Sequence, residues 1–228
     1  MLNYVVEPAV LRPFVPVGTE LDSWRGLTFV SLVGFLFADT RVLGLPIPWH
    51  RTFEEVNLRF YVRRQYNGET RRAVTFIREL VPRAAIAWTA RWAYNEPYRA
   101  LSMRHRFGPA RADGAPASIA YEWRSGSAWT SLTAEPSGEG GWVDVGSQEE
   151  FITEHYWGYT RQRDGSTVEY RVEHPKWRVW PVPAPKLEGD LAEVYGTTMA
   201  RILREPPASA FVADGSPVTV FLPVRLPR

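Results

Sequence analysis

Four polar side chains alternate along one predicted strand, and together they could carry out acid–base or anion-binding chemistry. Apolar and polar residues alternate from 55 to 63, which places on one face Glu55, Asn57, Arg59 and Tyr61. An arginine on such a face can hold a carboxylate through two parallel hydrogen bonds. A desolvated glutamate beside it could donate or accept a proton. The same pattern also fits an antiparallel strand with one face in water, and the pattern alone favours that simpler interpretation.

A second candidate lies at the end of another predicted strand. His174 comes directly before Pro175, and its side chain shares a face with Tyr170 and Val172. Histidine is the side chain that titrates nearest neutrality, so His174 is a candidate proton shuttle. Trp177 could form the wall of a pocket. The structural interpretations are a packed, hydrogen-bonded His174 and a buried core Trp177.

A third segment combines Arg91 with Tyr98. Arg91 lies near the end of a predicted helix, where an arginine is usually solvated. Pro97 and Tyr98 follow in a predicted turn, and such a pair most often serves only to form the turn. From the residues alone, neither position is assigned a chemical role.

Strand patterns dominate the rest of the sequence. They predict a strand buried on both faces at 26–38 and further strands at 55–63, 73–80, 118–124, 128–133, 167–174 and 218–222. Short helices are predicted at 8–14, at 82–94 and after Ser147, which forms a capping box with Glu150. We therefore predict one mainly-β (α+β) domain over residues 1–228, built as a barrel or a folded-over sheet with a few short helices.

Composition and missing motifs exclude several classes of function. The chain has 228 residues, no cysteine and a formal net charge of +2. The absence of cysteine excludes disulfides, thiolate nucleophiles, cysteine-ligated zinc and iron–sulfur clusters. The sequence lacks a nucleophile elbow, a phosphate-binding loop and a His-Glu-x-x-His motif. Because its 4 histidines are scattered, we expect neither a metal nor a cofactor.

The sequence also gives an expectation for location and partners. Residues 1–7 do not read as a secretory signal, and the longest apolar run, 27–38, is shorter than the roughly 20 residues of a membrane-spanning helix. Basic residues are interspersed with acidic ones rather than gathered in one patch. We therefore expect a cytoplasmic protein with a small-molecule ligand and without nucleic-acid or membrane partners. The oligomeric state is left open.

Short motifs spread over nearly the whole chain carry a family resemblance. In order, they are Asn3-Tyr4, the run from Phe53 to Val62, Ala90-Arg91, Pro97-Tyr98 and His174-Pro175-Lys176-Trp177. In this order and spacing, the chain resembles the DUF2071 or YqjF-like family of uncharacterised bacterial proteins. That family looks like a distant relative of acetoacetate decarboxylase. The resemblance implies an antiparallel, cone-shaped β-barrel with a central cavity.

The same resemblance implies a site without its lysine. In acetoacetate decarboxylase, a lysine in a Pro-Lys-Lys turn forms a Schiff base with a keto acid, and a glutamate from an earlier strand lies in the same cavity. The matching turn here is Pro97-Tyr98-Arg99. Lys176 and Lys186, the only lysines, fall in no matching motif. Glu55 is the nearest match to the glutamate, so the cavity is expected to carry over and the lysine-dependent decarboxylation is not.

Our leading hypothesis is a cavity-containing protein that binds a small anionic or carbonyl-bearing molecule. The residues assigned to proton transfer are Glu55 and His174, and those assigned to ligand binding are Arg59, Tyr61, Arg91, Tyr98 and Trp177. One alternative is a lysine-independent lyase or hydrolase that uses Glu55 and His174. Another is a protein-interaction module with exposed tryptophan and arginine, which are common at binding hot spots.

Overall fold

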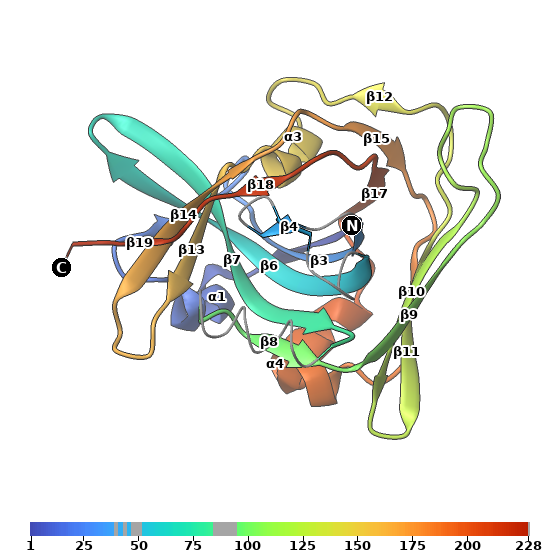
Figure 1. Ribbon diagram of the computed structural model, residues 1–228, viewed down its shortest axis with the longest axis horizontal. Helices are drawn as coiled ribbons and strands as arrows, with labels where there is room; N and C mark the ends of the chain where they lie inside the picture. Colours follow the sequence, from blue (N-terminus) through green and yellow to red (C-terminus); the bar gives the residue numbers. More distant parts are fainter. Residues whose placement is uncertain (39–40, 43–44, 47–51, 84–94, 228) are drawn as a thin grey trace.

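The computed structural model describes residues 1–38, 41–42, 45–46, 52–83 and 95–227. Two β-sheets and a few short helices make up most of this part of the chain. In Figure 1, the long strands of the larger sheet cross the middle of the molecule and the smaller sheet lies to their right.

The larger sheet has 13 strands. Its main path runs in the order β12 (Gly141–Trp142), β15 (Arg178–Pro181), β17 (Ser209–Ala213), β1 (Leu2–Val6), β3 (Thr28–Phe37), β6 (Phe53–Tyr66), β7 (Glu69–Val81), β13 (Trp157–Arg161), β14 (Thr167–Glu173) and β18 (Thr219–Val220). Three short strands pair beside this path: β2 (Glu20–Leu21) with β6, β8 (Tyr98–Ala100) with β7, and β19 (Val224–Arg225) with β14.

The remaining strands form two further sheets. The smaller sheet has the order β16 (Lys186–Glu188), β11 (Ala128–Ala134), β10 (Ile119–Ser125) and β9 (Ser102–Phe107). A separate pair consists of β4 (Arg41–Val42) and β5 (Leu45–Pro46). The smaller sheet packs onto β3 at Gly34, where an added Cβ would lie 2.6 Å from the ring of Tyr121. Trp123 from β10 is fully buried in the same core as Leu58 of β6.

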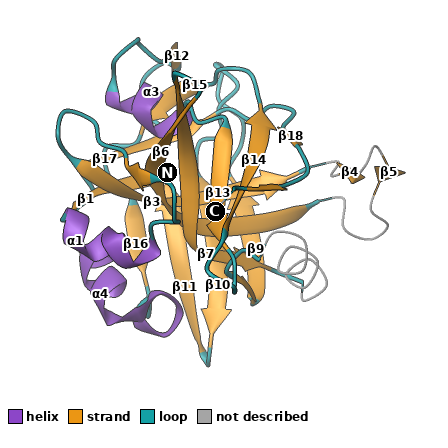
Figure 2. Cartoon of the chain, turned by 90° about the vertical axis from the view of Figure 1, so that its left-hand side faces the viewer, coloured by secondary structure: helices purple, strands orange, loops and turns teal. Residues whose placement is uncertain are grey.

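The described helices are short. They are α1 (Pro8–Leu11), followed by a 3₁₀ turn at Arg12–Phe14, then α3 (Gln148–Thr153) and α4 (Ala192–Arg204). The views in Figures 1 and 2 both place α1 beside α4. The Ser147 side chain caps α3 by accepting a hydrogen bond from the Glu150 amide at 3.1 Å. The Glu150 carboxylate reaches back to the amide of Gly146 at 2.6 Å, one residue before the amide that a capping box would use.

Strands β6 and β7 form a hairpin that positions most of the site. Asn67 and Gly68 both have positive φ, 49° and 80°, as a two-residue hairpin turn requires. The pairing register shifts once: Leu58 lies opposite Arg78, whereas Arg59 lies opposite Phe76. This bulge re-aims the β7 side chains that follow it.

The mainly-β prediction with few helices is confirmed, and the predicted strands at 26–38, 55–63, 73–80 and 167–174 coincide with β3, β6, β7 and β14. The predicted hairpin of 118–124 with 128–133 is β10 and β11. In the described part of the chain, no sheet closes on itself, so a closed barrel is not found. The sheet is not purely antiparallel either, because β7 pairs in parallel with β8 and with β13.

Other boundaries differ from the prediction. The predicted terminal strand at 218–222 is shorter in the structure, where it is β18, and β19 follows as a separate strand. Helix α4 has no counterpart among the predicted helices. Tyr98 lies in β8 rather than in a turn. The predicted helix at 82–94 falls almost entirely outside the described residues. None of the helices described is both long enough and apolar enough to cross a bilayer.

Candidate functional site

The polar face of β6 is buried, so the interpretation as a solvated strand face is wrong. Glu55 and Asn57 are each 2% exposed and Tyr61 is 1% exposed. Arg59 is half-buried. Burying charged groups is costly unless they find partners, so the contacts of this row decide what it can do.

One end of the row belongs to a cluster of carboxyl and hydroxyl groups. Glu55 accepts hydrogen bonds from Asn57 Nδ2 and from the hydroxyl of Tyr98, each at 3.1 Å. Glu79 lies opposite Asn57 in the β6–β7 register and opposite Tyr98 in the β7–β8 register. Its carboxyl group is therefore close to the same tyrosine hydroxyl, with which it also interacts. We call Glu55, Glu79 and Glu96 the carboxyl cluster.

Glu96, two residues before Tyr98, is the third member of the cluster. Its Oε1 accepts a hydrogen bond from the Tyr170 hydroxyl at 2.5 Å and a longer one from Thr160 Oγ1 at 3.4 Å. Tyr170 of β14 reaches Glu96 across its strand partner Gly158 of β13. A Cβ atom at Gly158 would lie 2.1 Å from the tyrosine ring, so only glycine leaves room for this path.

Burial raises the pKa of every carboxyl group in this cluster. Desolvation is the largest cause and raises the pKa of Glu55 to about 8, with a further rise from the charge of Glu96. Desolvation raises the pKa of Glu96 only to about 7, because the hydrogen bonds from Tyr170 and Thr160 favour its ionised form. The pKa of Glu79 is raised well above its ordinary value by burial and by the other two carboxylates. The cluster therefore retains protons at neutral pH.

The other end of the row is a hydrogen-bonded chain beside a buried histidine. Ser31 Oγ donates to Asn3 Oδ1 at 2.7 Å, which leaves the Tyr61 hydroxyl to donate to Ser31 at 2.6 Å. Arg59 Nη2 donates to the carbonyl of Ile152 at 3.1 Å. The ring of Tyr61 lies against His155, with 4.7 Å between centroids.

His155 is a site candidate that the sequence analysis missed. It is 6% exposed, and neither ring nitrogen makes a well-formed hydrogen bond within the described part of the chain. Desolvation, reinforced by the charges of Arg72 and Arg59, holds its pKa well below the usual value. His155 is therefore neutral at physiological pH. Its position after a capped helix gave no signal, because a buried histidine has no distinctive sequence pattern.

The structure groups only some of the residues that the sequence predicted. The Tyr98 hydroxyl bonds to Glu55, and the guanidinium carbon of Arg59 lies 5.9 Å from the centre of the Tyr61 ring. His174 is elsewhere: its ring stacks on Trp177 with centroids 4.2 Å apart. No hydrogen bond or ion pair joins His174 to Glu55 among the described residues, and Arg91 lies outside them.

Trp177 and the other tryptophans show mixed burial. Trp177 is half-buried, and its indole nitrogen donates to Ser216 Oγ at 2.8 Å. Of the described tryptophans, Trp123 and Trp180 are buried, whereas Trp129 and Trp142 are exposed. The burial of the described tryptophans therefore does not decide between a role in the core and a role in an interaction surface.

Neither lysine belongs to the carboxyl cluster. The Lys176 ammonium lies 3.8 Å from a Glu150 carboxylate oxygen, and its side chain is half exposed. Lys186 is exposed on β16, opposite Thr133 of the smaller sheet. Tyr98 belongs to the segment Pro97-Tyr98-Arg99, which the family resemblance matches to the lysine turn, and its hydroxyl bonds to the Glu55 carboxylate.

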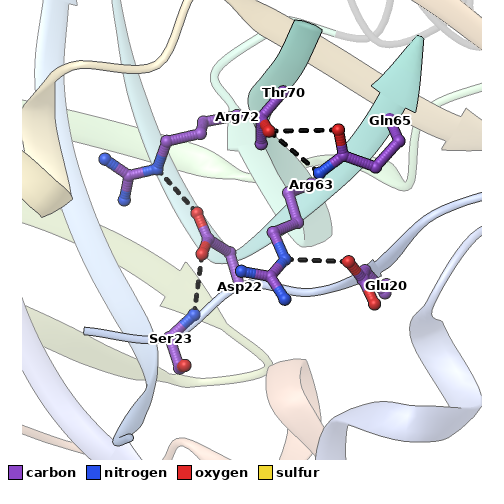
Figure 3. Close-up of polar contacts among 7 residues, drawn as sticks. All are labelled: Glu20, Asp22, Ser23, Arg63, Gln65, Thr70 and Arg72. Atoms are coloured by element: carbon purple, nitrogen blue, oxygen red, sulfur yellow. Dashed lines mark hydrogen bonds and ion pairs between the residues drawn. The ribbon is translucent and has the colours of Figure 1, made fainter. Parts of the chain in front are cut away.

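A surface pocket of about 280 Å³ lies between residues 22–25, strands β6 and β7, and the start of α3. Its lining includes Asp22, Arg63, Arg72 and Phe151. Figure 3 shows that its charges are mostly paired: Arg72 Nε bonds to Asp22 at 2.7 Å and Arg63 Nε bonds to Glu20 at 2.9 Å. No group of three or more histidine and acidic side chains in the described ranges is arranged to hold a metal ion.

The fold is shared with solved structures of acetoacetate decarboxylase-like proteins. An acetoacetate decarboxylase from Legionella pneumophila has a TM-score of 0.63 and 14% identity, covering 98% of this chain and 81% of that chain. An acetoacetate decarboxylase-like enzyme from Sphingomonas wittichii RW1 has a TM-score of 0.60 and 14% identity, covering 99% and 89%. The enduracididine biosynthesis enzyme MppR, solved with pyruvate, has a TM-score of 0.58 and 12% identity, covering 98% and 84%. The fold class is therefore mainly-β and acetoacetate decarboxylase-like.

Within this fold class, the chain belongs to the DUF2071 family, described as an uncharacterized conserved protein, whose sequence profile matches residues 1–217. It is 27% identical over 205 residues to the uncharacterized protein YqjF of Bacillus subtilis strain 168, covering 86% of this chain and 78% of that protein. The family predicted from the sequence motifs is confirmed.

Proposed function

We propose that this protein binds a small oxo acid in a cavity next to Glu55, without forming an imine. The carbonyl oxygen of the ligand accepts a hydrogen bond from protonated Glu55, and its carboxylate is held by Arg59. The observation that carries the proposal is that Glu55, a member of the buried carboxyl cluster, lies on the same face of β6 as Arg59, in a protein whose only lysines lie elsewhere.

Unpartnered buried atoms support the same location. Asn57 Oδ1, Glu79 Oε2 and Arg59 Nε are buried and have no hydrogen-bonding partner among the described residues. Leaving such atoms unpaired is costly, and a ligand with a carbonyl and a carboxylate would accept hydrogen bonds from the two that can donate, Arg59 Nε and protonated Glu79 Oε2. The solved relatives point to the same ligand class, since one was solved with pyruvate and another is named for acetoacetate.

A lysine-independent lyase is the second candidate function, and the raised pKa of Glu55 favours it. Proton donors with a pKa near neutrality are typical of acid–base catalysis. A bound β-oxo acid would break its bond to the carboxyl carbon and release CO₂. The electron pair would move into the carbonyl group, and Glu55 would supply the proton that neutralises the resulting enolate. In this scheme Tyr98 orients the Glu55 carboxyl group.

Calorimetric titration with pyruvate tests the binding proposal. We expect the wild type to bind pyruvate at pH 6–7 and to lose affinity as pH rises through about 8, because Glu55 then loses its proton. Glu55→Gln should remove this pH dependence. Arg59→Met should weaken binding at least about tenfold, since it removes a charged hydrogen bond.

The controls separate this site from general damage to the protein. Glu54 is adjacent to Glu55 but pairs with His105 of the smaller sheet at 2.7 Å, so Glu54→Gln should leave pyruvate binding unchanged. Pyruvate binding with the same pH profile in Glu55→Gln would contradict the proposal. Borohydride treatment with pyruvate should give no mass adduct. An adduct on Lys176 or Lys186 would show that imine chemistry occurs.

A further inference from the structure

Glu96 differs from the other members of the carboxyl cluster in the donors aimed at it. Tyr170 and Thr160 both point hydroxyl groups at its Oε1, at 2.5 and 3.4 Å. Glu55 receives one hydroxyl and one amide at 3.1 Å, while Glu79 Oε2 has no partner in the described part of the chain. Hydroxyl donors stabilise a carboxylate more than a carboxylic acid.

Glu96 is also fixed close to Glu55 by the backbone. The Tyr98 amide donates to the Glu96 carbonyl at 2.9 Å, and the Tyr98 hydroxyl in turn bonds to Glu55. Glu79, which lies opposite Tyr98, donates its amide to the carbonyl of Pro97 at 3.3 Å. All three carboxyl groups are less than 10% exposed, so water screens their mutual repulsion poorly.

We infer that Glu96 is a positioning residue: the hydroxyl groups of Tyr170 and Thr160 make it ionise before Glu55, and its charge then keeps Glu55 in the protonated form that the proposed ligand needs. The inference rests on the proposed function for the ligand, but the charge arrangement that it describes can be measured without a ligand. Glu96 itself touches no reacting atom in this account.

Charges from several elements act on Glu55, and they have different signs. Arg59 on β6 favours ionised Glu55, whereas Glu96 before β8 favours protonated Glu55. Glu79 on β7 is itself kept protonated by burial and by the charges of Glu96 and Glu55. Asn57 and Tyr98 donate hydrogen bonds that favour ionised Glu55. Two like charges that share a buried site ionise at different pH values, and the better-solvated carboxylate ionises first. Glu96 accepts hydrogen bonds from two hydroxyl groups, so it is the carboxyl group that ionises first.

Tyr170 can hold Glu96 only because residue 158 is glycine. The tyrosine ring crosses the Gly158 backbone, where a Cβ would overlap the ring. Tyr170 itself stays protonated, because burial raises the pKa of its hydroxyl well above the ordinary value. The β13–β14 pair therefore holds the Tyr170 hydroxyl, which stays protonated, as a hydrogen-bond donor to Glu96, and Gly158 leaves room for the tyrosine ring.

A pH titration of ¹³C-labelled glutamate carboxyl groups by NMR tests the inference without any ligand. Single Glu→Gln variants assign the signals by their loss. In the wild type, Glu96 should titrate at lower pH than Glu55. In Glu96→Gln, the midpoint of Glu55 should fall by about one pH unit or more, because the repelling charge is gone. Tyr170→Phe should raise the midpoint of Glu96.

Matched variants guard against an unfolded or merely destabilised protein. Glu54→Gln removes a charge from the neighbouring residue and should leave the Glu55 midpoint in place. Thr160→Val keeps the side-chain shape, removes the weaker donor and should raise the Glu96 midpoint by less than Tyr170→Phe does. An unchanged Glu55 midpoint in folded Glu96→Gln would overturn the inference, since a purely structural role predicts that result.

The titration and the binding experiment fail separately. If the Glu55 midpoint falls in Glu96→Gln but the wild type does not bind pyruvate, the charge arrangement stands and the proposed ligand is wrong. If pyruvate binds with the expected pH profile but the midpoint does not move, the proposed function stands and the role of Glu96 is wrong.

Discussion

At the scale of single residues, the site depends on carboxylic acids that burial keeps protonated. Glu55 is only 2% exposed, and this burial raises the pKa of its carboxyl group to about 8. His155 shows the opposite effect, since the same desolvation keeps it neutral. Burial thus keeps both Glu55 and His155 uncharged near neutral pH.

The raised pKa of Glu55 gives a stability prediction whose sign is fixed. Unfolded Glu55 loses its proton near its ordinary pKa, whereas folded Glu55 holds the proton up to about pH 8. The folded state therefore binds more protons at Glu55 in this window, so the contribution of Glu55 to the free energy of unfolding falls as pH rises, by up to about 1.4 kcal/mol per pH unit. Glu79 and Glu96 contribute with the same sign, whereas the buried N-terminus, whose pKa is lowered to about 5, contributes with the opposite sign. Glu55→Gln should remove the share of Glu55 and so make the slope less negative than that of the wild type, as measured by urea denaturation between pH 6.5 and 8.

This pH window avoids the contribution of His155. Because the pKa of folded His155 is depressed, its contribution to stability is lost only as pH falls below about 6.5. Glu188 provides the control, since it is exposed on β16 and has no ion pair among the described residues. Glu188→Gln should keep the wild-type slope. A wild-type slope in Glu55→Gln would contradict the raised pKa.

At the scale of strands and helices, the sequence predicted the row on β6 but not the groups that face it. Strict alternation places Glu55, Asn57 and Arg59 together, because neighbouring side chains on a strand point to opposite faces. Glu79 joins them through the β6–β7 register after a bulge that no local pattern marks. Glu96, two residues before β8, and Tyr170 of β14 join the cluster through strand pairing between distant segments, which alternation within one strand cannot specify.

Helix α4 was missed for a local reason. At its start the Asp190 carboxylate accepts a hydrogen bond from the Ala192 amide at 2.9 Å, but Gly196 inside the helix has a left-handed φ of 77°. This glycine interrupts the periodic pattern from which helices are predicted. By contrast, Ser147 gave a clear start signal for α3, and its side chain caps the helix as predicted.

The β13–β14 pair gives a prediction at Gly158. Gly158→Ala should lower the free energy of unfolding by about 1–3 kcal/mol, because its Cβ would overlap the Tyr170 ring and displace it from Glu96. Chemical denaturation measures the change. In a Tyr170→Ala background, the same substitution should cost much less, since no ring remains to be displaced.

Gly141 is the matched control for this substitution. It also lies in a strand, and an added Cβ would have no atom within 4 Å. Gly141→Ala should change the free energy of unfolding by less than about 0.5 kcal/mol. Equal costs at the two glycines, or an equal cost of Gly158→Ala with and without Tyr170, would show that the overlap with the ring is not the cause.

At the scale of the whole molecule, the fold matches acetoacetate decarboxylase-like structures, although the sequences are only 12–14% identical. Covering 98% of this chain, the Legionella pneumophila enzyme shares its architecture at 14% identity. The sequence motifs predicted the family and the mainly-β class. They did not predict the parallel pairing of β7 with β8 and β13, which is a long-range property of the sheet. A tyrosine–carboxyl contact lies where the resemblance implied a lysine turn.

The most direct test of the proposed site is a crystal structure of the protein grown with saturating pyruvate. We predict pyruvate between Glu55 and Arg59, with its carbonyl oxygen toward Glu55, its carboxylate toward Arg59 and no covalent bond to lysine. Pyruvate found only in the surface pocket beside Asp22 and Arg72, or bonded to a lysine, would contradict the account, as would crystals in which the surroundings of Glu55 hold no pyruvate.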